Sequence, residues 1–217
     1  MCGRYTVQVD MLEVHRRFKV ALDDLYQKNY NCAPTEKLPV ITDKHPEILS
    51  HFQWGLVPFW AKDAKTGFKM INVRRESLAE KPSFKNIMEK RRCLVVADGF
   101  YEWKKSGKEK QPFRIMLKTG AAYAFAGIWE HHKEFNLLTF SIITTTANEL
   151  VEPIHDRMPV ILQPEFEHKW LDPHLDPAEA MDLLQPYPAE LMTAYPVSNL
   201  VGNVRNKNPE LIHPLGQ

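Results

Sequence analysis

The second residue of the chain, Cys2, could carry nucleophilic chemistry on two adjacent groups. It follows Met1 and precedes Gly3-Arg4-Tyr5. Aminopeptidases generally remove an initiator Met that precedes a small side chain, so we expect the mature chain to begin with Cys2. Its α-amine and thiol then titrate near neutrality, at roughly 8 and about 8.5, and both have a nucleophilic form at cellular pH. The amine can condense with an aldehyde, and the thiol can close onto the imine carbon to give a thiazolidine.

Three other segments carry polar residues in patterns that suit a site. In an extended stretch, Asn72 and Arg74 point the same way and offer an amide and a guanidinium to one ligand. Glu102 stands between two large aromatic residues, where an apolar pocket would raise its pKa and suit it to general acid-base catalysis. His155, at an expected loop, can shuttle protons near neutrality, and Arg157 can bind an oxyanion. Taken singly, each segment is equally typical of a solvated polar run.

The composition indicates one globular domain. A chain of 217 residues can bury roughly 70% of its unfolded surface. Cys2, Cys32 and Cys93 form no C-x-x-C pair, which indicates neither a disulfide framework nor a zinc site. Residues 1–20 hold basic side chains without a long apolar run, and no stretch approaches the roughly 18 apolar residues that span a membrane. We expect a cytoplasmic protein, nucleoid-associated if bacterial, with no metal or cofactor.

The near-neutral net charge of +1 conceals two segments of opposite charge. Residues 61–92 carry ten basic and four acidic side chains, a local excess of +6. Residues 165–190 carry seven acidic side chains and one lysine, a local balance of −6. Such a pair of segments is typical either of a surface for polyanions beside a solvated one, or of two ordinary solvated faces.

The pattern of the chain predicts an α+β domain, with six to eight strands and four or five short helices in irregular order. Asp10 precedes an expected helix as its N-cap. The helical segments are expected at 11–18, 147–151, 164–171 and 177–184, with a mixed, partly helical stretch at 72–90. The strands are expected at 48–57, 93–97, 113–118, 121–129, 137–144 and 158–162, and residues 30–35 are expected to form a loop.

Six segments in order resemble the signatures of the SRAP (SOS-response-associated peptidase) family, whose members crosslink to abasic sites in DNA. They are M-C-G-R-Y at the start, N-x-A-P-T at 31–35, W-G-L-V-P at 54–58, N-V-R-x-E at 72–76, D-G-F-Y-E-W at 98–103 and H-D-R-M-P at 155–159. The resemblance runs from Cys2 to about Val204. Because six separate motifs agree in order, the likeness covers the whole domain and not one loop.

This resemblance implies a single domain over residues 1–217, in which about 205–217 form a C-terminal tail. It implies a curved, barrel-like, mixed or antiparallel sheet with short flanking helices and a basic groove leading to the N-terminus. By motif, Cys2 is the nucleophile, and Asn72 holds the Cys2 end and the opened sugar. Glu102 and His155 move protons.

The same resemblance implies the contacts with DNA. Arg4, Arg74 and Arg157 hold phosphates that flank the lesion, and Pro34 and Trp60 act as apolar wedges against unstacked bases. The expected partner is single-stranded DNA that contains an abasic site, and the expected state is a monomer. Phosphate contacts give salt-sensitive affinity, and aromatic side chains supply stacking.

The chemistry implied is a thiazolidine crosslink at the sugar aldehyde, with weak β-elimination at the imine stage, self-reversal and peptidase-like exposure of Cys2. Two alternatives stay open on the sequence alone. An N-terminal-nucleophile amidohydrolase would use the Cys2 thiol on an amide. A non-catalytic reader of modified or single-stranded DNA would keep the arginines and not need Cys2.

Overall fold

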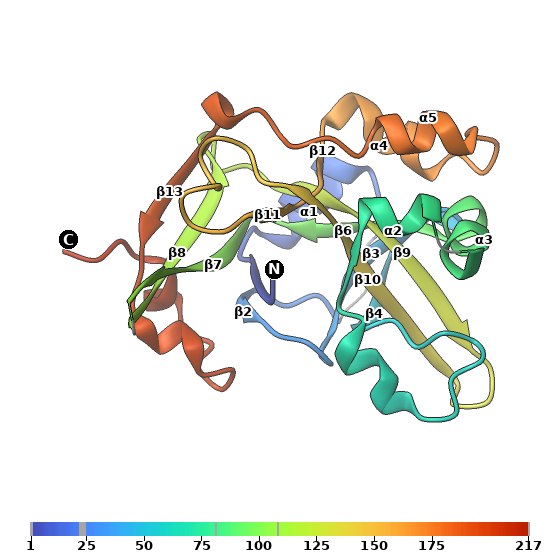
Figure 1. Ribbon diagram of the computed structural model, residues 1–217, viewed down its shortest axis with the longest axis horizontal. Coiled ribbons are helices and arrows are strands. Elements are labelled where there is room, and N and C mark those ends of the chain that lie inside the picture. The colour runs from blue at the N-terminus through green and yellow to red at the C-terminus, as the bar shows by residue number, and fades with distance from the viewer. Residues whose placement is uncertain (1, 22–24, 81, 108, 217) are drawn as a thin grey trace.

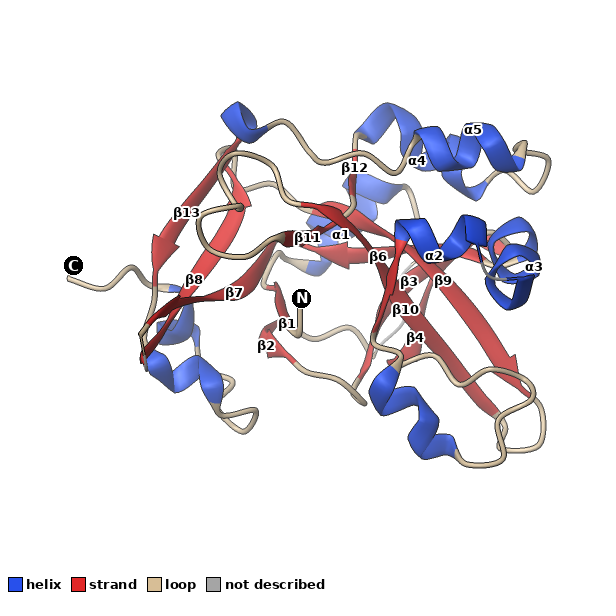
Figure 2. Cartoon of the chain, in the orientation of Figure 1, coloured by secondary structure: helices blue, strands red, loops and turns tan. Residues whose placement is uncertain are grey.

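The computed structural model describes residues 2–21, 25–80, 82–107 and 109–216, and two β-sheets dominate it (Figures 1 and 2). The smaller sheet has the strand order β13-β8-β7-β1-β2. Its strands are β1 (Arg4–Val7), β2 (Asn29–Cys32), β7 (Gly99–Ser106), β8 (Glu109–Leu117) and β13 (Met192–Pro196). All its pairings are antiparallel.

Five strands of the larger, eight-stranded sheet close into a ring. β10 pairs with β4 on one side and with β9 on the other, and β3 and β6 complete the circuit. These strands are β3 (Lys37–Thr42), β4 (His45–Trp54), β6 (Arg92–Ala97), β9 (Tyr123–His132) and β10 (Leu137–Thr146). The β10–β4 pairing is parallel and the others are antiparallel, so the expected barrel-like mixed sheet is confirmed.

Three short strands extend this ring on the side that carries the candidate site. β5 (Asn72–Arg74) runs parallel to β10, β11 (Arg157–Pro159) pairs with the end of β10, and β12 (Ile161–Leu162) pairs with β9. The strands that contain Asn72 and Arg157, β5 and β11, are therefore both paired with β10.

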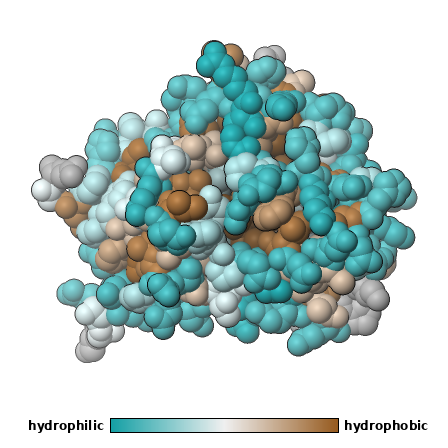
Figure 3. All heavy atoms as spheres, turned by 90° about the horizontal axis from the view of Figure 1, so that it is seen from above, coloured by the Kyte–Doolittle hydropathy of each residue, from teal (hydrophilic) through white to brown (hydrophobic). Residues whose placement is uncertain are grey.

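Short helices surround the sheets, and none of the helices in the described ranges is long and apolar enough to cross a membrane. The α-helices are α1 (Met11–Phe18), α2 (Arg75–Glu80), α3 (Pro82–Lys90), α4 (Pro164–Leu171) and α5 (Pro177–Asp182). The 3-10 turns are η1 (Ala64–Lys69), η2 (Ala189–Leu191), η3 (Asn199–Gly202) and η4 (Pro209–Ile212). Seen from above, the surface is largely hydrophilic, with apolar side chains in limited areas (Figure 3).

Aromatic side chains join the two sheets. Tyr5 of β1 is fully buried and meets Trp54 and Phe125 of the ring edge to face, with ring centroids 5.1 and 5.7 Å apart. Trp54 in turn stacks on Phe140. All residues of β6 are buried, as expected for an apolar strand covered on both faces. The core thus fixes β1, and with it the start of the chain, against the ring.

A buried carboxylate fixes β1 a second time. Asp98 accepts hydrogen bonds from the Thr6 hydroxyl (2.5 Å) and the Val9 backbone N–H (3.0 Å), and it forms an ion pair with Arg114 (3.2 Å). A side chain at Gly99 would put a Cβ 2.8 Å from both the Thr6 hydroxyl and the Arg114 guanidinium, so only glycine fits there. The D-G dipeptide therefore ties β1, β7 and β8 together.

Several expected elements differ from those observed. The expected helix at 147–151 is wrong, because the Asn148 side chain accepts from the Val151 N–H and turns the chain instead. The expected strand at 158–162 is two strands, since Val160 bonds to both β9 and β10 where the chain crosses between them. Residues 30–32 of the expected loop lie in β2. Asp10 does precede α1, but its carboxylate pairs with Lys28 instead of capping the helix.

The structure contains more strands than expected, thirteen in the described ranges against six to eight. β1, β3 and β13 carry prolines or polar residues that hide their pattern, and tertiary packing determines them. In the segment expected as a C-terminal tail, Leu211 is buried beside Tyr101, Val197 and Val201. Gln217 lies outside the described residues.

Candidate functional site

Cys2 lies two residues before β1 and is fully buried where the two sheets meet. Its carbonyl oxygen accepts a hydrogen bond of 2.6 Å from the Asn72 side-chain amide. Its thiol lies 3.6 Å from the Arg4 carbonyl oxygen. Burial, followed by the charge of Glu102, raises the pKa of the Cys2 thiol well above its usual range. Met1, whose removal the sequence predicts, lies outside the described residues.

Glu102 reaches the same region from β7. The antiparallel register places Arg4 opposite Tyr101, so the next residue on β7 faces the chain just before Arg4. Only 2% of Glu102 is exposed, and burial raises the pKa of its carboxyl to about 7. A carboxyl that titrates near neutrality can both give and take a proton at cellular pH. The expectation of a raised pKa is confirmed.

Asn72 is placed by the short strand β5, which pairs with Ile142 to Thr144 of β10. The amide nitrogen is committed to Cys2, while the buried Asn72 Oδ1 accepts no hydrogen bond from the residues that the structure describes. Two residues along the strand, Arg74 is exposed. Both line a pocket of about 410 Å³, together with Val73 between them, and their joint binding of one ligand stays a prediction.

That pocket has an apolar floor and a basic rim. Met70, Val73, Phe84 and Ile87 supply apolar surface, and Lys69 and Arg74 supply positive charge. Trp60, 58% exposed, forms part of the wall. The basic segment noted in the sequence thus forms η1, β5, α2 and α3, and each of these elements contributes to the pocket lining.

His155 follows the turns after β10 and precedes β11. Its Nδ1 lies 2.8 Å from the Asp156 carboxylate and 3.0 Å from the Arg157 backbone N–H. Nδ1 donates to the Asp156 carboxylate when it carries a proton and accepts from the Arg157 N–H when it does not. The two contacts therefore require different tautomers of neutral His155. Burial, and then nearby positive charge, lowers the pKa of His155. The charge of Asp156 also raises the pKa of Glu102. The loop that carries His155 and strand β7 are therefore coupled electrostatically.

The three arginines expected at phosphates are in different environments. Arg74 is exposed, whereas Arg157 is 9% exposed and makes a two-pronged pair with Glu76 at 2.9 and 3.0 Å. Arg4 donates to the Asn31 side chain and to carbonyls of the C-terminal segment. Phosphate binding by Arg4 and Arg157 therefore stays a prediction that requires these contacts to be shared or exchanged.

The expected wedge residues lie on two loops. Pro34 is half-buried in the turn after β2, where Thr35 has a left-handed backbone (φ 74°) and donates its N–H to the Trp54 carbonyl. Trp60 follows Phe59, which is 66% exposed. The stacking role of Pro34 and Trp60 is not tested by these positions.

Sequence reasoning missed two supports of the site. One is the Asp98–Arg114 pair; the D-G dipeptide before the aromatic motif was the available signal. The other is the C-terminal segment, whose asparagines gave no signal. Among the described residues, no group of three His, Cys, Asp or Glu side chains could hold a metal ion.

Comparison with known proteins agrees with this arrangement. The family model for SOS response associated peptidase (SRAP) matches residues 1–204. The abasic site processing protein YoqW of Bacillus subtilis is 47% identical over 221 residues, covering 98% of this chain and 99% of that protein. The abasic site processing protein HMCES of Gallus gallus is 36% identical over 227 residues, covering 88% of this chain and 67% of that protein.

Solved structures show the same fold. A protein from Bacteroides thetaiotaomicron superposes with a TM-score of 0.88 at 31% identity, covering 98% of this chain and 99% of that one. A phage-related protein from Bordetella bronchiseptica gives 0.72 at 28% identity, covering 90% and 94%. With the motifs, the ring-shaped sheet and the arrangement of Cys2, Asn72 and Glu102 in place, the chain belongs to the SRAP family.

Proposed function

We propose that this protein senses abasic sites in single-stranded DNA and crosslinks to them through Cys2 after Met1 is removed. The observation that carries the proposal is the arrangement of the buried Cys2 and Glu102 with Asn72 where the two sheets meet. Asn72 holds the Cys2 backbone at 2.6 Å, and a buried glutamate with a pKa of about 7 acts on the same residue. The relatives named abasic site processing proteins support the choice of lesion.

The reaction begins at the ring-opened sugar, whose C1′ is an aldehyde carbon. The Cys2 α-amine attacks C1′ to give a carbinolamine, which loses water to form an imine. The Cys2 thiol then adds to the imine carbon while its proton passes to the imine nitrogen, which closes a thiazolidine. One water leaves in total. A lysine imine would lack the second ring closure and would hydrolyse more easily, so the thiol accounts for a durable crosslink.

Glu102 is placed to move the protons of these steps. With a pKa of about 7, it can protonate the leaving hydroxyl and regain a proton from the amine or the thiol. Burial raises the pKa of the Cys2 thiol, so its proton must be removed when the thiol attacks, and Glu102, whose charge also raises that pKa, is the group proposed to take it.

Asn72 and His155 act on the sugar in this proposal. The unused Asn72 Oδ1 can accept a hydrogen bond from a hydroxyl of the opened sugar while the amide nitrogen keeps hold of Cys2. His155 would protonate the sugar ring oxygen on opening and assist reversal. Burial lowers the pKa of His155, so the protonated ring is the minor form near pH 7, and His155 must first take up a proton before it can protonate the sugar oxygen.

DNA would lie along the basic pocket beside Cys2. Arg74 is exposed for a phosphate, and Trp60 offers an exposed ring for an unstacked base. Arg4 and Arg157 would add phosphate contacts by sharing their present partners, and Pro34 would wedge a neighbouring base. Single strands suit such a site because their sugars need no unpairing.

Further properties follow from the same chemistry. The imine permits β-elimination of the 3′ phosphate, which gives weak lyase activity, and the thiazolidine can reopen, which gives self-reversal. Met1 removal could be peptidase-like. We propose a monomer that acts in the cytoplasm on DNA.

The test is incubation with single-stranded DNA that carries one abasic site, followed by a denaturing gel. Wild-type protein should give a heat-stable shifted band, and Cys2→Ala should give none while still binding DNA. Cys2→Ser should fail to give a durable adduct, although borohydride should trap its imine. A heat-stable band from Cys2→Ala without reductant would exclude the thiazolidine. Mass spectrometry of the mature N-terminus should show that Met1 is absent.

A further inference from the structure

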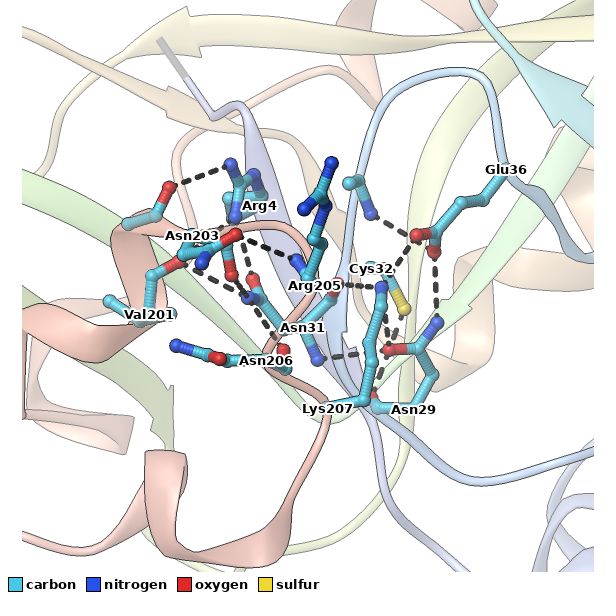
Figure 4. Close-up of polar contacts among 12 residues, drawn as sticks. Arg4, Asn29, Asn31, Cys32, Glu36, Val201, Asn203, Arg205, Asn206 and Lys207 are labelled. Carbon is cyan, nitrogen blue, oxygen red and sulfur yellow. Dashed lines mark hydrogen bonds and ion pairs between the residues drawn. The ribbon is translucent and has the colours of Figure 1, made fainter.

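The segment that follows η3 is tied to the start of the chain by a cluster of hydrogen bonds (Figure 4). Arg4 donates to the carbonyl oxygens of Val201 (2.9 Å) and Gly202 (3.2 Å). The side-chain amide of Asn31, on β2, donates to the carbonyls of Val201, Asn203 and Asn206 at 3.0 to 3.1 Å. These carbonyls surround the side chains of Arg4 and Asn31, which lie on the paired strands β1 and β2. We call this set of carbonyls, those of Val201, Gly202, Asn203 and Asn206, the cradle.

Lys207 closes the far end of this cradle. Its ammonium contacts the Asn31 carbonyl oxygen at 2.5 Å and the Glu36 carboxylate at 2.5 Å. Both ends of the short segment 201–207 are therefore anchored to β2 and its following turn. A backbone anchored at both ends holds the residues between them in a defined place, even where their side chains are exposed.

Arg205 stands in the middle of this anchored segment and is exposed. Its backbone N–H donates to the Asn203 side chain, which fixes the local turn. In Figure 4 no dashed line reaches the Arg205 guanidinium, whereas the Arg4 guanidinium is bonded to the carbonyls of Val201 and Gly202. Within the described part of the chain, no carboxylate forms an ion pair with Arg205, whereas the neighbouring Lys207 is paired with Glu36. Arg205 therefore presents an uncompensated guanidinium close to the carbonyls that hold Arg4.

We propose that Arg205 is a further phosphate-binding residue of the DNA site, presented by the segment that Arg4, Asn31 and Lys207 anchor. This proposal rests on the proposed function and extends it to residues beyond 204, where the family match ends. Arg4 then has two tasks: it positions the segment through its carbonyl contacts, and it offers its other N–H groups to the same strand of DNA.

The cradle also explains why the segment ends in polar residues. Leu211 and Val201 are buried beside Tyr101, which lies opposite Arg4 in the pairing of β1 with β7. The segment is thus fixed to the site by an apolar contact on one side and by hydrogen bonds on the other. The Arg205 side chain takes part in neither the apolar contact nor these hydrogen bonds, so it is available to a ligand.

The experiment measures noncovalent binding of single-stranded DNA as a function of salt, with the variants made in the Cys2→Ala protein. Arg205→Ala should weaken binding several-fold at low salt and reduce the slope of log affinity against log salt by roughly 0.7, the value for one phosphate on a single strand. Arg205→Lys should restore most of the slope. Arg16→Ala, an exposed arginine on α1, is the matched control and should change neither.

The two proposals fail differently. If the wild-type protein crosslinks abasic DNA but Arg205→Ala matches Arg16→Ala, then Arg205 binds no phosphate and this inference is overturned. If the wild-type protein neither binds nor crosslinks abasic DNA, the proposed function itself falls, and this inference falls with it. Circular dichroism of Arg205→Ala should match wild type, because no core contact is removed.

Discussion

The two sheets hold their strands by different means. In the ring of the larger sheet, β6 is buried throughout and β9 almost throughout, and their side chains are mostly apolar. In the five-stranded sheet, β1 is held by a buried carboxylate, an arginine and a carbonyl cradle as well as by Tyr5. Apolar packing tolerates small changes of volume, whereas hydrogen bonds fix position within tenths of an ångström. The reactive residue thus lies on the sheet that is held by directional contacts.

The largest effect should come from Glu102, which belongs to that polar sheet. Glu102→Gln keeps the size and some hydrogen bonding but cannot exchange a proton, so the crosslinking rate should fall by about 10² to 10⁴-fold. The wild-type rate should rise through an apparent pKa of about 7, and this inflection should disappear in the variant. Rates from quenched gels between pH 5.5 and 8.5 measure both. Wild-type-like formation by Glu102→Gln would show that the carboxyl is structural.

The same pKa has a consequence for stability. In the folded protein Glu102 holds its proton up to about pH 7, whereas an unfolded glutamate releases it near roughly 4.3. The folded state therefore binds the proton more tightly within this window, and stability should decrease as pH rises through it. Urea unfolding of Glu102→Gln should lack this decrease.

Next in size is the buried pair that fixes β1. Asp98→Ala leaves the Arg114 charge without its partner, which should cost about 3 to 5 kcal/mol of unfolding free energy. Ile128→Val in the apolar ring should cost about 0.5 to 1.5 kcal/mol. At a temperature where both variants are folded, only Asp98→Ala should slow crosslinking. Equal crosslinking rates for Asp98→Ala and Ile128→Val at matched stability would contradict the conclusion that the directional contacts of the smaller sheet position Cys2.

His155 should affect both the formation of the crosslink and its release. If it protonates the sugar oxygen, His155→Ala should slow transfer of a preformed crosslink to competitor DNA by about 10²-fold, the lower end of a general-acid contribution. Asp156→Asn is the matched control, because it removes the neighbouring charge and keeps the imidazole. Unchanged release by His155→Ala would assign the ring to holding the Arg157 backbone.

The smallest effect belongs to the exposed rim of the larger sheet. Arg74→Ala should reduce the salt slope of single-strand binding by roughly 0.7 and leave the crosslinking rate of bound DNA unchanged. Lys118→Ala, a solvent-exposed cation at the end of β8, should leave the slope unchanged. An affinity that does not respond to salt at all would contradict a phosphate-binding groove.

The sequence predicted the family and the ring fold because six motifs agreed in order. It predicted the apolar strand at 93–97 and the helix at 164–171, whose patterns are local. It did not predict β1 as a strand, since Arg4-Tyr5-Thr6-Val7 is too short and polar and is fixed by Asp98, about ninety positions away. Local pattern carries no information on such pairings.

The site shows the same division. Glu102 is buried as expected, but not by Tyr101 and Trp103, whose side chains lie on the other face of β7 in a separate cluster with Val197 and Leu211. The pairing of Arg157 with Glu76 and the cradle around Arg4 could not be foreseen, since they join segments that the sequence keeps apart.

The bond between Arg4 and Val201 spans 197 positions of the chain. Closing so long a loop is slow compared with forming hairpins, and during synthesis the early strands wait for the last segment. Cys2 would thus be made first, yet the cradle that sets its strand would arrive last. A growing chain would carry the amine and the thiol without the assembled site, so catalysed reaction with a bound abasic sugar would begin only when synthesis is nearly complete.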